Sequence, residues 1–299
     1  MSKPDFRCGY AALIGRPNAG KSTLLNRLVG EKIAAVSNKP QTTRHKIKGI
    51  VTRDDGQIVF VDTPGIHKPG YLLNRRMMAS VYDAVLSVDL IVLIRDASVS
   101  TGNGDKFVLD LVKKSQKPSI LLLNKIDKLK DKKELLPLID FYSHEYDFAE
   151  IIPISALSGY ALDLLLKKII DHLPLQGPLF SKDELTDQPL RTIAAEIVRE
   201  KILSATGEEI PYITAVKTEH WDESNPNQIQ IACVIFVERP SQKGIVIGHK
   251  GASLKKIGTE ARLDIEKLVG KSVHLRLFVK VEPGWRNREN TLDEIGIRA

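Results

Sequence analysis

An eight-residue segment near the N-terminus has the residue types and spacing required to bind phosphate. Gly15-Arg-Pro-Asn-Ala-Gly-Lys-Ser22 matches the pattern G-x-x-x-x-G-K-[ST], directly after an apolar stretch and before a helix-like one. In such loops backbone N–H groups surround the phosphates, and the N-terminus of the helix adds positive potential. The sequence therefore predicts a phosphate-binding loop in which Lys21 reaches the β and γ phosphates and Ser22 ligates magnesium. The loop residues are Gly15, Arg16, Pro17, Asn18, Ala19, Gly20, Lys21 and Ser22.

A second segment predicts which nucleobase is bound. Asn124-Lys-Ile-Asp127 follows the apolar run 120–123. A carboxylate only accepts hydrogen bonds, and guanine offers it two adjacent donors where adenine presents a lone pair. Unpaired polar groups of this kind discriminate by about 10⁴. Asp127 is therefore predicted to select guanine, and the alternative is a helix cap at Asp127 without a ligand.

Three shorter segments could complete a nucleotide site, although each alone is also an ordinary turn. Asp62 ends an apolar run and could hold magnesium through water, while Gly65 could offer its N–H to the γ phosphate. Thr43, in the basic stretch before that run, could add a hydroxyl to the magnesium shell, and Ser155-Ala156 could contact the guanine edge. The predicted nucleotide contacts beyond the loop are Asp62, Thr63, Pro64, Gly65, Ile66, Asn124, Lys125, Ile126, Asp127, Ser155 and Ala156.

The elements that must position these segments alternate between strand and helix. Parallel strands buried on both faces are short, continuously apolar runs, and such runs occur at 10–14, 58–62, 90–94, 120–123 and 151–154. Helix-like segments occur between or after them at 21–29, 105–114, 135–146 and 162–172. This alternation predicts a doubly wound α/β sheet, in which ligands bind beyond the carboxyl ends of the strands.

The pattern changes in the last 120 or so residues. The stretch 174–189 has three prolines and no periodicity, which indicates a linker. The order after it is helix, strand, strand, two helices joined by a Gly-rich turn, and a strand. That turn, Gly248-His-Lys-Gly251, has the GxxG spacing that packs against sugar–phosphate backbone in KH domains, although a plain helix–turn–helix connection is the alternative.

The charge around this turn favours nucleic acid as a ligand. Nine basic residues and three acidic ones lie between Lys243 and Lys280, although such a run is also found on solvated faces without a ligand. The predicted RNA contacts are Ile247, Gly248, His249, Lys250, Gly251, Lys255 and Lys256.

Length, charge and cysteine content limit the remaining classes. The chain has 299 residues, enough for two domains, and a net charge of +7. Its two cysteines, Cys8 and Cys233, are expected to be small core residues in a reducing compartment. No apolar run reaches the roughly 18–20 residues that span a bilayer, and the N-terminus lacks the apolar stretch of a signal peptide. We therefore expect a cytoplasmic protein with at most peripheral membrane contact.

Five segments occur in the order and spacing of a GTPase: the phosphate loop, QTTR at 41–44 (the Thr switch), DTPG at 62–65, NKID at 124–127 (NKxD) and SAL at 155–157 (SAx). Over residues 7–173 they resemble a translation-factor-class GTPase. One such set is present, which excludes the family with tandem GTPase domains. With the GxxG module, the segments GRPNAGKS, QTTR, DTPGIHKP, NKID and VIGHKG resemble the Era family of ribosome-assembly GTPases. The resemblance implies a P-loop GTPase domain with a doubly wound sheet at 7–175, a linker at 176–190, a smaller α+β KH type-2 domain at 191–283 and a C-terminal tail at 284–299.

The same resemblance implies a biochemical role. It implies a switch that binds GTP or GDP with Mg²⁺, hydrolyses GTP, and binds the 3′ end of 16S ribosomal RNA and the 30S subunit during small-subunit maturation. It also implies a protein that associates loosely with the inner face of the cell membrane. We further expect a monomer without affinity for DNA.

Hydrolysis is expected to be slow, because Ile66 stands where regulatory GTPases carry a water-orienting Gln. No side-chain general base is assigned, and the residues that could assist catalysis are Lys21, Thr43 and Asn18. Asn18 could ligate K⁺ beside the phosphates, as similar loops do in related GTPases, or it could only hydrogen-bond the loop backbone. Two other functions remain open: a KH RNA-binding protein whose nucleotide domain hardly turns over, and a GTPase of tRNA modification. The second class carries a C-terminal Cys, whereas this sequence ends Ile-Gly-Ile-Arg-Ala299.

Overall fold

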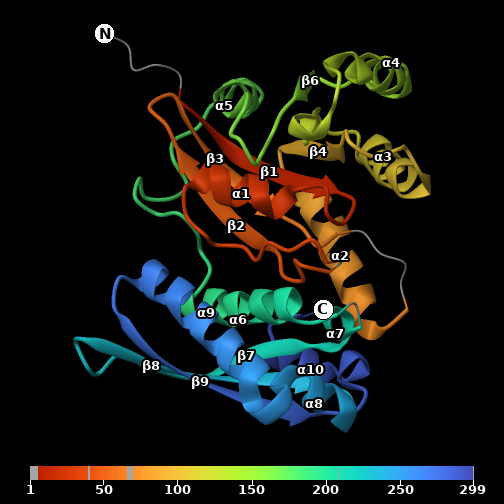
Figure 1. Cartoon of the computed structure of the whole chain (residues 1–299). Helices are drawn as coiled ribbons and strands as arrows, with labels where there is room; N and C mark the ends of the chain where they lie inside the picture. The colour runs from red at the N-terminus through yellow and green to blue at the C-terminus, as the bar shows by residue number, and fades with distance from the viewer. Residues whose placement is uncertain (1–5, 40, 66–69, 208, 299) are drawn as a thin grey trace. The chain divides into compact units, whose positions relative to one another are not determined.

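The structure, a computed structural model, describes residues 6–39, 41–65, 70–207 and 209–298 (Figure 1). These residues form two compact units. The first unit lies within Met1–Glu31, Lys46–His67 and Met78–Asp187, and the second lies within Lys32–His45, Lys68–Met77 and Gln188–Ala299. The second unit therefore includes a segment that the sequence places between the phosphate loop and Asp62.

The first unit is built on a six-stranded sheet with the strand order β2-β3-β1-β4-β5-β6. Its strands are β1 (Arg7–Gly15), β2 (Ile47–Thr52), β3 (Gly56–Asp62), β4 (Leu90–Asp96), β5 (Ser119–Asn124) and β6 (Glu150–Pro153). β2 runs antiparallel to β3, and the other neighbouring strands are parallel. The parallel strands β1, β3 and β5 run in the same direction, so their last residues, Gly15, Asp62 and Asn124, all lie at the carboxyl ends of the strands.

Helices pack against this sheet through apolar side chains. The helices α2 (Leu72–Ser87, of which 78–87 belong to this unit), α3 (Asn103–Ser115) and α4 (Leu135–Glu145) share one buried cluster with β1, β4 and β5. The helices α1 (Lys21–Val29) and α5 (Leu162–Asp171) contact β1 and β3. Gly20 and Gly30 flank α1 in left-handed conformations, with φ of 100° and 86°, which glycine adopts without steric cost. The phosphate-binding loop is thereby joined directly to the first turn of α1.

The second unit has a three-stranded sheet with the order β7-β8-β9. Its elements are α6 (Leu190–Ala205), α7 (Ile210–Ile213), β7 (Ala215–Asp222), β8 (Gln228–Val237), α8 (Pro240–Ile247), α9 (Ala252–Val269), β9 (Ser272–Val281) and α10 (Glu289–Glu294). β8 pairs antiparallel with β7 and parallel with β9. The helices α6 and α9 bury Ile197, Ile257 and Ile265 in a cluster with the sheet. Side chains alternate along β9: its even-numbered residues from Ser272 to Lys280 are exposed, and the odd-numbered ones are buried or half-buried.

The predicted strands and helices are present, and the differences from prediction have physical reasons. The sequence pattern misses β2, because only half of this strand is buried and it lacks a continuous apolar run. The short helix α7, which has Pro211 in its first turn, ends at Ile213, and β7 therefore begins only at Ala215. After β9, Trp285 is fully buried in a second cluster with Leu292, so the predicted tail contributes to the core of this unit.

The predicted linker is attached to the first unit over much of its length. Gln57 Oε1 accepts hydrogen bonds from the N–H groups of Leu179 and Phe180 at 2.8 and 2.9 Å, and Lys48 pairs with Asp187 at 2.7 Å. Both cysteines are fully buried, which confirms that they are core residues. Within the described part of the chain, no helix is both long enough and apolar enough to cross a bilayer.

Candidate functional site

The phosphate loop connects β1 to α1, as the sequence predicts. Lys21 is only 5% exposed, and its Nζ donates to the carbonyl oxygens of Gly15 and Arg16 at 3.1 Å each. Burial lowers the pKa of Lys21, while the Asp62 carboxylate acts in the opposite direction. The loop needs glycine at its start, because a Cβ on Gly15 would lie 2.4 Å from the carbonyl oxygen of Ile94. The loop thus holds a lysine ammonium group at the N-terminus of α1, where a phosphate ligand would require it.

Two of the three predicted magnesium ligands meet in the first unit. Ser22 Oγ donates to Asp62 Oδ2 at 2.8 Å, and Asp62 is fully buried at the end of β3. The neighbouring Thr63 donates its hydroxyl to the carbonyl oxygen of Leu13 at 2.9 Å, which fixes the start of the following loop. Hydroxyl and carboxylate oxygens are the hard donors that Mg²⁺ prefers, so this donor set fits the ion. Thr43, the third predicted ligand, belongs to the second unit.

Asn124 joins the phosphate loop to the segment that is predicted to contact the base. Its side chain is buried, with Nδ2 donating to the carbonyl oxygen of Ala19 at 2.8 Å and Oδ1 accepting from the N–H of Ala156 at 3.0 Å. A Cβ on Gly20 would lie 2.3 Å from Asn124 Nδ2, so this close approach requires glycine. The structure therefore brings the phosphate loop, NKxD and SAx segments together through one amide.

The other polar residues of the NKxD segment are also held in place. Lys125 Nζ donates to the carbonyl oxygen of Asn18 at 2.6 Å and pairs with Asp96 at 2.7 Å. Asp127 Oδ1 accepts from Ser155 Oγ at 2.5 Å. The bond from Ser155 orients the carboxylate that is predicted to read guanine. Ile126, between Lys125 and Asp127 in the sequence, is buried and packs in the core cluster of the sheet.

The segment after β3 approaches the phosphate loop closely. Thr63, Pro64 and Gly65 are buried. A Cβ on Gly65 would lie 3.0 Å from Pro17 Cα, so any side chain at this position requires the phosphate loop to shift by a few tenths of an ångström. Ile66, which the sequence also assigns to the nucleotide site, lies outside the described residues.

Sequence reasoning misses an ion-pair network that anchors the phosphate loop to α3. Asp105 Oδ2 lies 2.8 Å from Arg16 Nη1, and Asp105 Oδ1 lies 3.2 Å from Arg95 Nε. Arg95 and Asp105 are both nearly inaccessible to solvent, whereas Arg16 is partly exposed. Asp105 also accepts from the N–H of Gly102 at 2.9 Å, at the start of α3. No local pattern indicates the contact with the phosphate loop, because Arg16 and Asp105 lie 89 positions apart in the sequence.

The predicted RNA-binding residues of the second unit surround the turn between α8 and α9. Gly248, Lys250 and Gly251 have φ of 73°, 48° and 80°, so the turn depends on left-handed backbone. A Cβ on Gly248 would lie 2.7 Å from Ser253 Cβ, whereas nothing lies within 4 Å of one on Gly251. The exposed residues of the predicted set are His249, Lys250, Lys255 and Lys256, while Ile247 is half-buried.

A groove of about 420 Å³ lies beside this turn, between α9 and β9. It is lined by Gly251, Leu254, Lys255, Gly258, Thr259, Arg262, Leu275 and Leu277. Leucine side chains from both elements supply apolar surface, and Lys255 and Arg262 add positive charge. Apolar surface next to a GxxG turn and basic side chains can hold an unstacked nucleobase while the turn contacts the sugar–phosphate backbone.

Comparison with known proteins agrees with this arrangement. The family model described as 50S ribosome-binding GTPase matches residues 10–125, and the KH domain model matches residues 209–286. GTPase Era of Trichlorobacter lovleyi is 47% identical over 296 residues, which are 99% of each chain. A crystal structure of a single-residue variant of Aquifex aeolicus Era bound to GDP.AlF4⁻ superposes with a TM-score of 0.94 at 41% identity, covering 98% of this chain and 100% of the other.

A second solved structure, of Era in complex with MgGDPNP and nucleotides 1506–1542 of 16S ribosomal RNA, has a TM-score of 0.95 at 41% identity. It covers 98% of this chain and 100% of its own. The GTPase and KH matches, the order of the two units and the full-length identity agree. The chain belongs to the Era family of GTPases.

Proposed function

We propose that this chain is a GTP-hydrolysing switch protein that binds the 3′ end of 16S ribosomal RNA and assists maturation of the small ribosomal subunit. The nucleotide half of the proposal depends on Asn124, whose amide joins the phosphate loop to Ala156. A phosphate cradle and a base-reading segment held by one side chain are expected of a site that binds a whole guanine nucleotide. The nucleotide complexes of the two Era structures support the same assignment.

The residues of the nucleotide site have distinct proposed roles. Lys21 neutralises the β and γ phosphates, the backbone N–H groups of 15–22 surround them, and Asp127 accepts from guanine N1–H and the exocyclic amine. Ser22, Thr43 and, through water, Asp62 would hold Mg²⁺, which offsets the phosphate charge when it is bound. No side chain is assigned as a general base, so these residues act by orienting the nucleotide and by stabilising charge.

The RNA half of the proposal depends on the turn between α8 and α9 and on its basic surroundings. His249, Lys250 and Lys255 are exposed, and the adjoining groove has an apolar wall from β9. The Era complex with nucleotides 1506–1542 supports the 3′ end of 16S ribosomal RNA as the ligand. Phosphate contacts by lysines make affinity depend on salt, which gives the assay a specific signature.

A charge reversal in the turn tests this assignment. Lys250→Asp changes an exposed side chain, so the fold should remain intact while a carboxylate repels the RNA backbone. We expect affinity for a 3′-terminal 16S fragment to fall by at least about tenfold and the salt dependence of log K to lose about 0.7–1 unit of slope. Lys130→Asp, at an exposed lysine of the first unit, is the matched control. Equal RNA affinity and slope for the two variants would contradict the RNA site.

The wider proposal concerns where the protein acts. We propose a cytoplasmic monomer that associates with the 30S subunit and makes peripheral contact with the inner face of the cell membrane, as the family resemblance implies. Cosedimentation with purified 30S subunits tests the first association, and flotation with vesicles of anionic phospholipid tests the second. Sedimentation equilibrium tests the monomeric state, which a concentration-dependent mass would contradict.

A further inference from the structure

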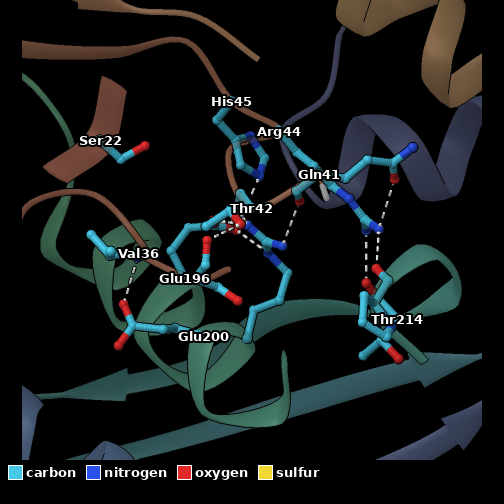
Figure 2. Close-up of polar contacts among 12 residues, drawn as sticks. Ser22, Val36, Gln41, Thr42, Arg44, His45, Glu196, Glu200 and Thr214 are labelled. Carbon is cyan, nitrogen blue, oxygen red and sulfur yellow. Dashed lines mark hydrogen bonds and ion pairs between the residues drawn. The ribbon is translucent and has the colours of Figure 1, made fainter. Parts of the chain in front are cut away.

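The segment Lys32–His45, which carries the predicted magnesium ligand Thr43, packs into the second unit. Figure 2 shows Gln41, Thr42 and Arg44 beside residues of the second unit. Thr43 is 6% exposed and Arg44 is 2% exposed, so this part of the segment is buried rather than displayed as a surface loop. We call residues 32–45 the switch segment.

A buried arginine of α6 binds the backbone of the switch segment next to Thr43. Arg199 is 1% exposed, and its guanidinium donates to the carbonyl oxygen of Gln41 at 3.1 Å and to the carbonyl oxygen of Thr42. Arg199 also pairs with Glu196 at 2.5 Å. A buried guanidinium is unfavourable unless its N–H groups are hydrogen-bonded. Arg199 of α6 therefore needs the carbonyl oxygens of the switch segment as acceptors, and the same bonds hold the segment against α6.

On the other side of Thr43, the side chain of Arg44 is anchored in the same unit. Its Nη1 donates to the carbonyl oxygen of Thr214, and its Nη2 donates to the carbonyl oxygen of Pro211, at 2.7 Å each. The Arg44 guanidinium also lies 5.7 Å from the ring centroid of the buried Trp285. These contacts involve α7 and the residue that follows it, together with Trp285 in the C-terminal part of the unit.

The beginning of the switch segment is tied to the same helices. Lys32 Nζ pairs with Glu200 of α6 at 2.6 Å and with Asp264 of α9 at 2.9 Å. Glu200 also accepts from the N–H of Val36 at 2.8 Å, a contact drawn in Figure 2. The segment therefore has anchors at its start and on both sides of Thr43.

These anchors restrict where Thr43 can lie. Consecutive Cα atoms are about 3.8 Å apart, so a residue between two held neighbours has little freedom to move. We propose that Arg199, through its bonds to the carbonyl oxygens of Gln41 and Thr42, is a positioning residue for Thr43, the predicted magnesium ligand. The inference rests on the proposed role of Thr43. The γ phosphate of GTP and its Mg²⁺ order such segments. The inference therefore implies that the affinity for GTP depends on Arg199, whereas the affinity for GDP does not.

Two substitutions of Arg199 test this inference in the full-length protein. Arg199→Ala removes the donor, and Arg199→Lys keeps a charge that can pair with Glu196 but lacks the planar fork that reaches two carbonyl oxygens. Arg191→Lys, at an exposed position of the same helix, is the matched control. The readouts are the dissociation constants of GDPNP and GDP in Mg²⁺ and the Mg²⁺ midpoint for GDPNP binding. Hydrogen exchange of residues 41–44 gives a readout without nucleotide.

We expect Arg199→Lys to weaken GDPNP binding roughly 10- to 100-fold, because one or two residues must then be ordered on binding, and to raise the Mg²⁺ midpoint. GDP affinity should change less than about twofold, and the amides of 41–44 should exchange faster. An equal loss for both nucleotides, or tighter GDPNP binding, would overturn the inference. An equal loss of affinity for both nucleotides would mean that the substitution disturbs the protein as a whole. Tighter GDPNP binding would mean that α6 keeps Thr43 away from the magnesium ion.

Thr43→Ala separates this inference from the proposed function. If Thr43→Ala weakens GDPNP binding selectively and Arg199→Lys does the same, the positioning role is supported. If only Thr43→Ala has the effect, the ligand assignment stands and the positioning role is wrong. If Thr43→Ala leaves GDPNP affinity and the Mg²⁺ midpoint unchanged, the ligand assignment fails and the positioning role fails with it. Arg199→Ala leaves Glu196 without this partner. If this variant folds, its GDPNP affinity should change in the same direction as that of Arg199→Lys.

Discussion

Replacing Asn124 with Ala should destabilise the first unit and weaken nucleotide binding together. The substitution removes the donor to the buried carbonyl oxygen of Ala19 and the acceptor for the buried N–H of Ala156. Each buried group left unpaired costs about 1–3 kcal/mol, so the pair predicts a loss of about 2–6 kcal/mol in the free energy of unfolding. At about 1.4 kcal/mol per tenfold, a comparable loss of preorganisation in the loop would weaken GDP binding by more than about tenfold.

Urea unfolding of the full chain can follow the two units separately. Both tryptophans, Trp221 and Trp285, lie in the second unit, so tryptophan fluorescence reports on that unit and far-UV circular dichroism reports on both. With a urea dependence of about 1–3 kcal/mol per M, a loss of about 3 kcal/mol lowers the midpoint by about 1–3 M. We expect this shift in the circular dichroism transition.

Two further variants define the controls for Asn124→Ala. Asn103→Ala, at an exposed position at the start of α3, measures the generic effect of the substitution. Asn124→Asp keeps an acceptor for the Ala156 N–H but faces the Ala19 carbonyl oxygen with a carboxylate, so it should damage the contact with the phosphate loop selectively. Surface substitutions usually change the free energy of unfolding by no more than about 0.5 kcal/mol. If the free energies of unfolding of Asn124→Ala and Asn103→Ala differ by less than that, the bridging role is refuted.

Three other predictions concern the base, the cation and the cysteines. Asp127→Asn should shift preference from GTP to XTP, because an amide can donate to the C2 carbonyl of xanthine, and unchanged GTP affinity in a competition assay would remove Asp127 from the base site. Single-turnover GTP hydrolysis should be faster in KCl than in NaCl at equal ionic strength for wild type but not for Asn18→Ala, and equal wild-type rates would exclude a K⁺ role. Burial raises the pKa of Cys233 to about 11, so at pH 8 only about one molecule in a thousand carries the thiolate there. Mass spectrometry after iodoacetamide treatment should show no alkylation of Cys233 until guanidinium unfolds the chain, and rapid modification of the native protein would contradict its burial.

Much of the nucleotide site could be predicted from local sequence because its chemistry is carried by short segments. A phosphate loop needs its glycines, Lys21 and Ser22 at fixed spacing, and the apolar runs 10–14 and 120–123 identify the strands that end at Gly15 and Asn124. Buried parallel strands then require those ends to meet at one edge of the sheet. The sequence therefore determined the fold class and the guanine nucleotide as ligand, and it predicts which residues surround the phosphates.

The antiparallel edge strand and the C-terminal core could not be predicted in the same way. β2 is only partly buried, so its residues lack the periodicity that identifies the inner strands. Trp285 is fully buried and donates to the carbonyl oxygen of Ile213 at 2.9 Å, far away in the sequence. A single aromatic residue after a strand has no local signature of burial.

Only the tertiary structure decided which distant residues anchor the phosphate loop and the switch segment. Asp105 anchors Arg16 of the phosphate loop, and Arg199 of α6 holds the carbonyl oxygens of Gln41 and Thr42 beside Thr43. In each case the partner of a charged side chain is a backbone group or a carboxylate more than 80 positions away in the sequence, and neither has a pattern of its own. Sequence periodicity reports which face of an element is buried, whereas the pairing of buried charges is set by how the elements pack.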